Sequence, residues 1–155
     1  MSTRLAVESL EKAKAILNQE VGISEWVTIS QWDIDRFAEL SSDNQWIHVD
    51  AERAKTESPF GSTIAHGFLT LSKLTQLASS ATEVTLGAKT LINYGFNKVR
   101  FVSPVLSGSR VRGHFKLTDA REIEGGYELI WNVTVEVEGR EKPAVVAEWI
   151  GRGYF

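Results

Sequence analysis

Cysteine is absent from the 155 residues of the chain. Without a thiol the chain cannot form a disulfide scaffold, a zinc–thiolate site or an iron–sulfur cluster, and it cannot use a cysteine nucleophile. Histidine is scarce as well: there are three, and no two of them stand one helical turn apart. That spacing is typical of metal-binding helices, so we expect no metal site.

Long apolar runs and an excess of positive charge are also missing. The longest uncharged stretch, Ser58 to Ser72, is too short to cross a bilayer. Glu8 and Glu11 lie where a secretory signal would be apolar. The formal net charge of -3 argues against binding driven by nucleic-acid phosphates. We therefore expect a cytoplasmic protein that contacts neither membrane nor nucleic acid.

The composition is that of an ordinary folded domain. Hydrophobic residues make up 43% and charged residues 24% of the chain. No repeat, low-complexity tract or proline-rich linker divides it. We expect one domain over residues 1–155, since two independent cores would each be small.

Helices are predicted in the first half. Residues 4–18 carry apolar side chains near one face, which indicates a helical N-terminal extension over about residues 1–20. Residues 25–29 favour a short strand. Ser30 with Asp33 is a helix-start pattern, and that helix is expected to end near Ser41. Asp50 is an expected cap for a further short helix.

The segment 65–80 predicts a second long helix. It contains no charge before Lys73, and its apolar residues are spread around the axis. A helix that is apolar on most sides is usually buried. We expect this helix to lie at the centre of the fold.

Strands dominate after residue 83. Apolar and polar residues alternate over 111–117 and 127–137, and 145–154 is predicted as the last long strand. Residues 91–94 and 98–102 form either two short strands or one bent strand. The fold class is therefore α+β, with a largely antiparallel sheet wrapped against the buried helix.

The polar stretch Ser41 to Asp50 contains the first candidate site. Asp43 and His48 stand close together in it, between two predicted helices. A carboxylate and an imidazole that converge can hold one water, take its proton and deliver a proton nearby. The alternative is that Asp43 caps a turn and His48 is an ordinary structural histidine.

The second candidate is the start of the central helix, Gly61 to Gly67. A helix N-terminus presents unpaired N–H groups, and Gly67 allows a thioester carbonyl to approach them as an oxyanion hole. Alternatively, Gly67 permits close packing of helix on sheet. His66 is a candidate substrate contact or a structural hydrogen-bonding residue.

Together, Asp43-Asn-Gln-Trp-Ile-His48 and Ala65-His-Gly67 resemble the motifs of the MaoC-like (R)-specific enoyl-CoA hydratases. The segment Ile92 to Phe101 is similar to the nodulation protein N branch of that family. The resemblance implies a hotdog fold, in which an antiparallel sheet curls round a long helix. It also implies a homodimer, and an acyl-CoA or acyl carrier protein thioester as substrate.

Carried over residue by residue, the resemblance assigns catalysis to Asp43 and His48 and the oxyanion hole to Gly67. Thr75 corresponds to a serine near the site in some members. Trp46 stands where the family has proline, so packing of Trp46 must stiffen the loop.

The implied reaction is reversible addition of water to a trans-2-enoyl-CoA, giving an (R)-3-hydroxyacyl-CoA, with no cofactor. On the expected strand 98–102, Lys98 and Arg100 are candidate contacts for coenzyme A phosphates or simply solvated residues. An acyl-CoA thioesterase is the alternative enzyme, but residues 68–80 lack the carboxylate it usually needs. A non-catalytic acyl-CoA-binding protein is the other alternative.

Overall fold

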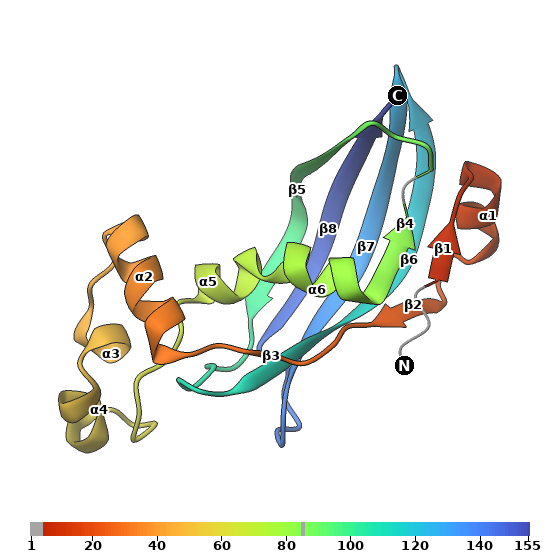
Figure 1. The fold of residues 1–155 in the computed structure, drawn as a ribbon. Helices are drawn as coiled ribbons and strands as arrows, with labels where there is room; N and C mark the ends of the chain where they lie inside the picture. Colours follow the sequence, from red (N-terminus) through yellow and green to blue (C-terminus); the bar gives the residue numbers. More distant parts are fainter. Residues whose placement is uncertain (1–4, 85) are drawn as a thin grey trace.

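The computed structural model describes residues 5–84 and 86–155 and shows a curved sheet crossed on one face by a helix (Figure 1). The sheet has the order β2-β6-β7-β8-β5, and β3 also pairs with β6. Its paired strands are antiparallel: β2 (Glu20–Ile23), β3 (Val27–Thr28), β5 (Thr90–Phe101), β6 (Arg110–Ile123), β7 (Gly126–Val137) and β8 (Val145–Tyr154). The α+β class and the three long strands predicted near the C-terminus are confirmed.

Strand β5 settles one alternative left open by the sequence. Residues 90–101 form one strand, with register shifts against β8 between Asn93 and Gly95 and between Phe96 and Lys98. Such irregularities bend a strand, so the single bent strand is correct. Strand β5 is also an edge of the sheet.

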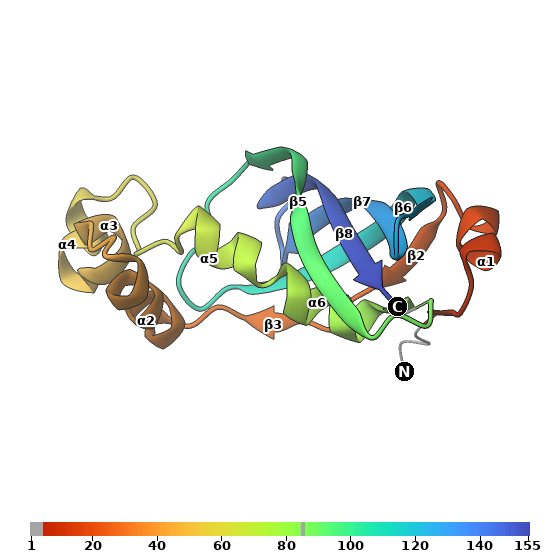
Figure 2. The same ribbon diagram turned by 90° about the horizontal axis from the view of Figure 1, so that it is seen from above.

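The central helix consists of α5 (Gly67–Ser72) and α6 (Leu74–Ala81), and Lys73 between them keeps a helical conformation. Leu69, Leu74 and Leu77 are buried. The helix lies across the concave face of the sheet (Figure 2). The helix is not buried on every side, since Phe68 is 67% exposed. The sheet of one chain covers only one side of the helix.

The predicted helix over 4–18 is shorter than expected. Residue 4 and those before it lie outside the described residues. Leu5–Val7 forms strand β1, which pairs in parallel with β4 (Thr82–Val84). Helix α1 covers only Leu10–Ala15, because the Ser9 side chain accepts from the Lys12 N–H and caps it there. The pairing with distant β4 overrides the local helical pattern.

Three helices form a separate group beyond one end of the sheet (Figures 1 and 2). They are α2 (Gln31–Ser41), α3 (Trp46–Val49) and α4 (Ala51–Glu57). The caps predicted at Ser30 and Asp50 are confirmed: Ser30 and Asp33 form a reciprocal capping box, and Asp50 accepts from the Arg53 N–H. Helix α3 was not predicted. We call residues 31–66 the overhang.

No helix in the described part of the chain has both the length and the apolar character needed to cross a membrane.

Candidate active site

The site lies where the overhang meets the central helix. Helix α2 ends at Ser41, and Ser42 takes a left-handed conformation with φ of 61°. A left-handed residue reverses the chain after a helix, which brings Asp43 back towards α3. His48 lies within α3 and is buried.

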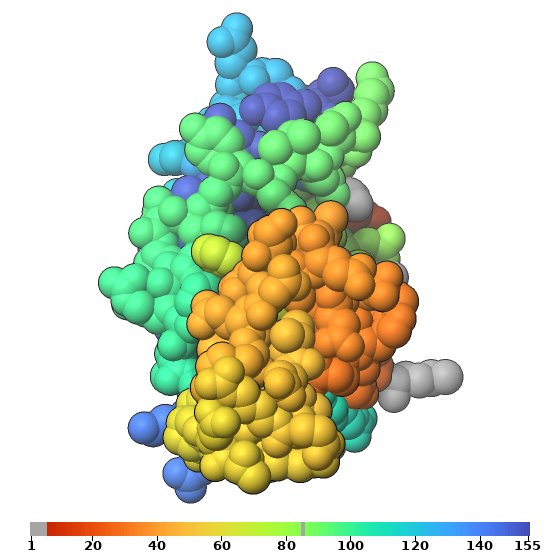
Figure 3. Space-filling view, turned by 90° about the vertical axis from the view of Figure 1, so that its left-hand side faces the viewer, coloured from red at the N-terminus to blue at the C-terminus, as the bar shows by residue number. Residues whose placement is uncertain are grey.

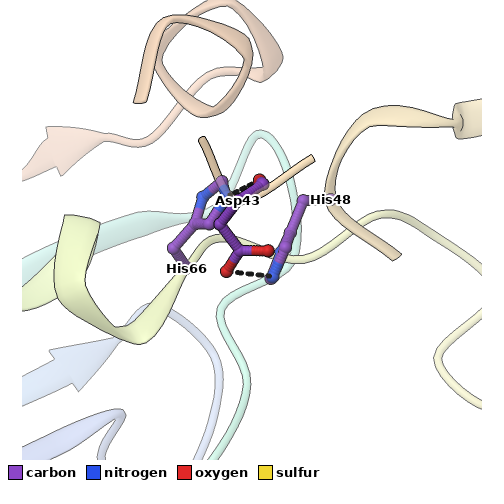
Figure 4. A group of neighbouring side chains, drawn as sticks. All are labelled: Asp43, His48 and His66. Atoms are coloured by element: carbon purple, nitrogen blue, oxygen red, sulfur yellow. Dashed lines mark hydrogen bonds and ion pairs between the residues drawn. The ribbon is translucent and has the colours of Figure 1, made fainter. Parts of the chain in front are cut away.

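Asp43 and His48 face each other, as predicted from the sequence (Figure 4). Asp43 Oδ2 and His48 Nε2 are 3.9 Å apart, and the side chains are 42% and 8% exposed, respectively. This distance is too long for a direct hydrogen bond. A water about 2.8 Å from each atom would make an angle of roughly 90° at its oxygen, so one water beside the pair can hydrogen-bond to both atoms.

The hydrogen bond on the other side of the His48 ring defines its tautomer. His48 Nδ1 lies 2.7 Å from the backbone oxygen of Ile64. A carbonyl oxygen can only accept, so Nδ1 carries the proton. In the neutral ring, Nε2 then presents its lone pair towards Asp43. His48 is therefore oriented to take a proton from a water held between the two side chains.

His66 contacts both members of this pair. Its Nε2 donates to the backbone oxygen of Asp43 over 2.9 Å, and its ring stacks on His48 with centroids 3.8 Å apart. Within the described residues, His66 Nδ1 is buried without a hydrogen-bond partner. His66 lines neither of the two cavities described below, and its assignment as a substrate contact stays a prediction.

Gly67 shares a cavity of about 230 Å³ with His48. Gly67 is the first residue of α5, so its N–H has no acceptor within the helix. A Cβ at this position would lie 2.9 Å from the ring of Phe101, which also lines the cavity. Phe101 was not predicted as a site residue, because β5 brings it here from far along the chain. Both readings of Gly67, ligand approach and close packing, therefore have a physical basis.

The other predicted residues are more scattered. The Arg53 guanidinium stacks on Trp46 at 4.3 Å from the ring centroid, which ties the start of α3 to α4. Thr75 lines a second cavity of about 490 Å³ between α6 and the sheet. Lys98 and Arg100 are exposed on β5 and line neither cavity.

Asp43, His48 and His66 also place metal-ligand atoms within 4.8 Å of one another. The ring planes of His48 and His66 are only 23° apart and stacked. Imidazole lone pairs lie in the ring plane, so stacked rings do not direct them at one ion. The arrangement suits proton transfer better than metal coordination.

Comparisons with known proteins identify the family. Residues 12–138 match the MaoC like domain. The chain is 47% identical to Nodulation protein N of Rhizobium meliloti over 95% of this chain and 92% of that protein. It is 49% identical to 3-hydroxyacyl-thioester dehydratase Z of Mycobacterium tuberculosis over 94% and 95%, respectively.

Solved structures show the same fold. The R-hydratase PhaJ1 from Pseudomonas aeruginosa superposes with a TM-score of 0.68 at 22% identity, covering 89% of this chain and 81% of that one. The (R)-hydratase from A. caviae gives a TM-score of 0.62 at 25% identity, covering 83% and 94%. The curved sheet of this chain, with the central helix across its concave face, is thus a hotdog fold. The chain belongs to the MaoC-like hydratase and dehydratase family, and its relatives that are named dehydratase or hydratase are hydro-lyases.

Proposed function

We propose that the protein is an (R)-specific enoyl-CoA hydratase, which adds water reversibly to a trans-2-enoyl thioester to give an (R)-3-hydroxyacyl thioester. The observation that carries the proposal is the 3.9 Å separation of Asp43 Oδ2 and His48 Nε2 beside the Gly67 amide. Its relatives named dehydratase and R-hydratase support the same reaction.

The chemistry follows from these three groups. Asp43 and His48 hold one water, and His48 Nε2 takes its proton as the water oxygen bonds to Cβ. The electrons of the double bond move towards the thioester oxygen, where the Gly67 N–H stabilises the enolate. The proton then returns from His48 to Cα. Water is consumed whole, so the reaction requires no redox partner.

The substrate is an acyl thioester of coenzyme A or acyl carrier protein. Its carbonyl would lie in the cavity beside His48 and Gly67, and its acyl tail along α6 in the second cavity. Trp131 and Trp149 line that cavity together with Thr75, which makes much of its surface apolar. Thr75→Phe should then lower kcat/KM for octenoyl-CoA about tenfold and spare crotonyl-CoA. Equal losses on both substrates would show that the acyl tail does not lie in this cavity.

We further propose that two copies pair through β5. This edge strand exposes large apolar side chains: Leu91, Ile92, Tyr94 and Phe96 among them. Strand β5 (green) and the overhang (orange to yellow) are exposed on the same face of the molecule (Figure 3). An uncovered apolar edge is a pairing surface. Sedimentation should give a dimer, and a 17.3 kDa species at micromolar concentration would contradict the pairing.

The function is tested with crotonyl-CoA. Loss of the enoyl absorbance without thiol release is the expected result. Thiol release would identify a thioesterase instead. Binding with neither change would identify a non-catalytic acyl-CoA-binding protein.

A further inference from the structure

Gln31 is the first residue of α2, and its side-chain amide makes hydrogen bonds to three different groups. Its Nε2 donates to the backbone oxygen of His48 and to Asp35 Oδ1, each over 2.8 Å. Its Oε1 accepts from the hydroxyl of Thr63. The amide therefore links α2, the catalytic helix α3 and the segment that precedes the central helix.

Thr63 continues this link to the His48 ring. Thr63 is 2% exposed, and the next residue, Ile64, provides the carbonyl that accepts from His48 Nδ1 over 2.7 Å. The Ile64 N–H donates to the backbone oxygen of Ile47 over 3.0 Å. The backbone of His48 and the acceptor of its ring are thus held by two segments that Gln31 joins.

We propose that Gln31 and Thr63 are a pair of positioning residues that set the tautomer and direction of His48. If the link is broken, the Ile64 N–H still bonds to Ile47, but the segment 62–64 is free to rotate about that bond and turn the Ile64 carbonyl away from His48. Nδ1 then loses its acceptor, and the tautomer with the proton on Nε2 becomes populated. That tautomer cannot accept a proton from water. The effect on turnover rests on the proposed function, but the effect on the tautomer does not.

Two nearly isosteric variants test the pair. Gln31→Met removes both the Nε2 donor and the Oε1 acceptor of the amide, and Thr63→Val removes the hydroxyl. Each should lower kcat on crotonyl-CoA roughly 10- to 100-fold, the range known for loss of a partner that orients a metal-ligating histidine, with KM little changed. The double variant should be no slower than the worse single, because both changes break the same link. Thr63→Ser should restore turnover.

The second readout is nitrogen NMR of His48. At a pH where the His48 ring is neutral, the wild type should show the proton on Nδ1, and both variants should show the Nε2-protonated form as well. This measurement distinguishes the two proposals: a tautomer shift in a protein that hydrates no enoyl thioester would retain the positioning role and reject the function. Thr63→Val carries the test if Gln31→Met does not fold.

The matched control is Gln19→Met, which changes an exposed glutamine between α1 and β2. It should leave both kcat and the His48 spectrum unchanged. Wild-type turnover in Gln31→Met would overturn the proposal. So would losses that multiply in the double variant while the His48 tautomer stays unchanged, since Gln31 and Thr63 would then act independently.

Discussion

In the sheet and the helix that crosses it, the buried side chains are mainly aliphatic and aromatic, whereas several buried positions next to the site are polar. Phe115, Leu117 and Leu77 are almost fully buried in the first region. His48, Thr63 and His66 are buried where the overhang meets the helix, and hydrogen bonds hold each of them. Apolar burial is strong and non-directional, while hydrogen bonds fix the directions of particular atoms.

We therefore expect the sheet–helix core to determine the stability of the fold and the overhang to determine turnover. Most of the buried hydrophobic side chains of the described residues lie in the sheet and the helix that crosses it, and their removal from water stabilises the fold. The overhang orients the two groups that would move protons. Variants in the core should therefore lower the free energy of unfolding, and variants in the overhang should lower turnover.

The largest expected effect is in the overhang. Asp43→Asn and His48→Gln should each lower kcat on crotonyl-CoA roughly 10³-fold, because each removes one partner in proton transfer and barely changes size. The melting temperature should stay within a few degrees of the wild type. Steady-state kinetics and thermal unfolding measure the two quantities. A variant that keeps most of its turnover would show that its residue is not catalytic.

The reverse pattern is expected in the core. Leu77→Ala deletes a fully buried side chain of α6, which should lower the free energy of unfolding by about 3 kcal/mol. Below the melting transition, kcat per folded molecule should stay near wild type. Urea unfolding and active-site titration provide the comparison. A large fall in kcat with intact stability would show that the two regions are not separable in this way.

Gly67 lies where the two regions meet, so its substitution should affect both. Gly67→Val places branched carbon against Phe101 and where the substrate carbonyl would lie. The carbonyl would then be kept away from the N–H of residue 67, and loss of one oxyanion donor typically costs about 100-fold in rate. The double variant Gly67→Val/Phe101→Ala relieves the contact with the ring and should recover stability but not activity. Phe101→Ala alone is the control. Recovery of activity in the double variant would assign Gly67 to packing.

The smallest effect concerns ion pairs far from the site. Burial alone raises the pKa of Glu128, but hydrogen bonds from Arg152 and Arg121 outweigh it and hold the pKa below its ordinary value of 4.5. A lowered pKa in the folded state contributes stability above pH 4.5, which is lost as pH falls through the folded value. Glu128→Gln should be about 1.5 kcal/mol less stable at pH 7.

The difference in stability between wild type and Glu128→Gln should narrow as the pH falls below 4.5. Chemical unfolding at a series of pH values measures it. A constant difference down to pH 3 would contradict the assigned pKa. The pH profile of kcat should be the same for both proteins, since Glu128 does not contact Asp43 or His48 in the hydrogen bonds and ion pairs of the described residues.

Much of this fold was predictable, because its determinants are local. The alternation along β6 and the capping box at Ser30 are visible within a few residues, and both were correct. Asp43 and His48 were found because the motif places both in one short segment. Glu128 was expected on the outer, polar side of its strand, yet it is 2% exposed.

The features that could not be predicted from the sequence depend on contacts between distant segments. Glu128 is covered by arginines on the neighbouring strands β6 and β8, which alternation along β7 cannot show. Strand β1 depends on β4, some 75 residues later. Gln31 looks like any residue at the start of a helix, and only the fold brings it to His48 and Thr63.

The most direct test is hydration of crotonyl-CoA in D₂O. If one water held by Asp43 and His48 supplies both the hydroxyl and the proton, the product should be (R)-3-hydroxybutyryl-CoA with one deuterium at Cα, added to the same face as the oxygen. NMR coupling constants and chiral analysis of the product distinguish this from the alternatives. Addition to opposite faces, or deuterium at random on both, would contradict a single water shared by Asp43 and His48.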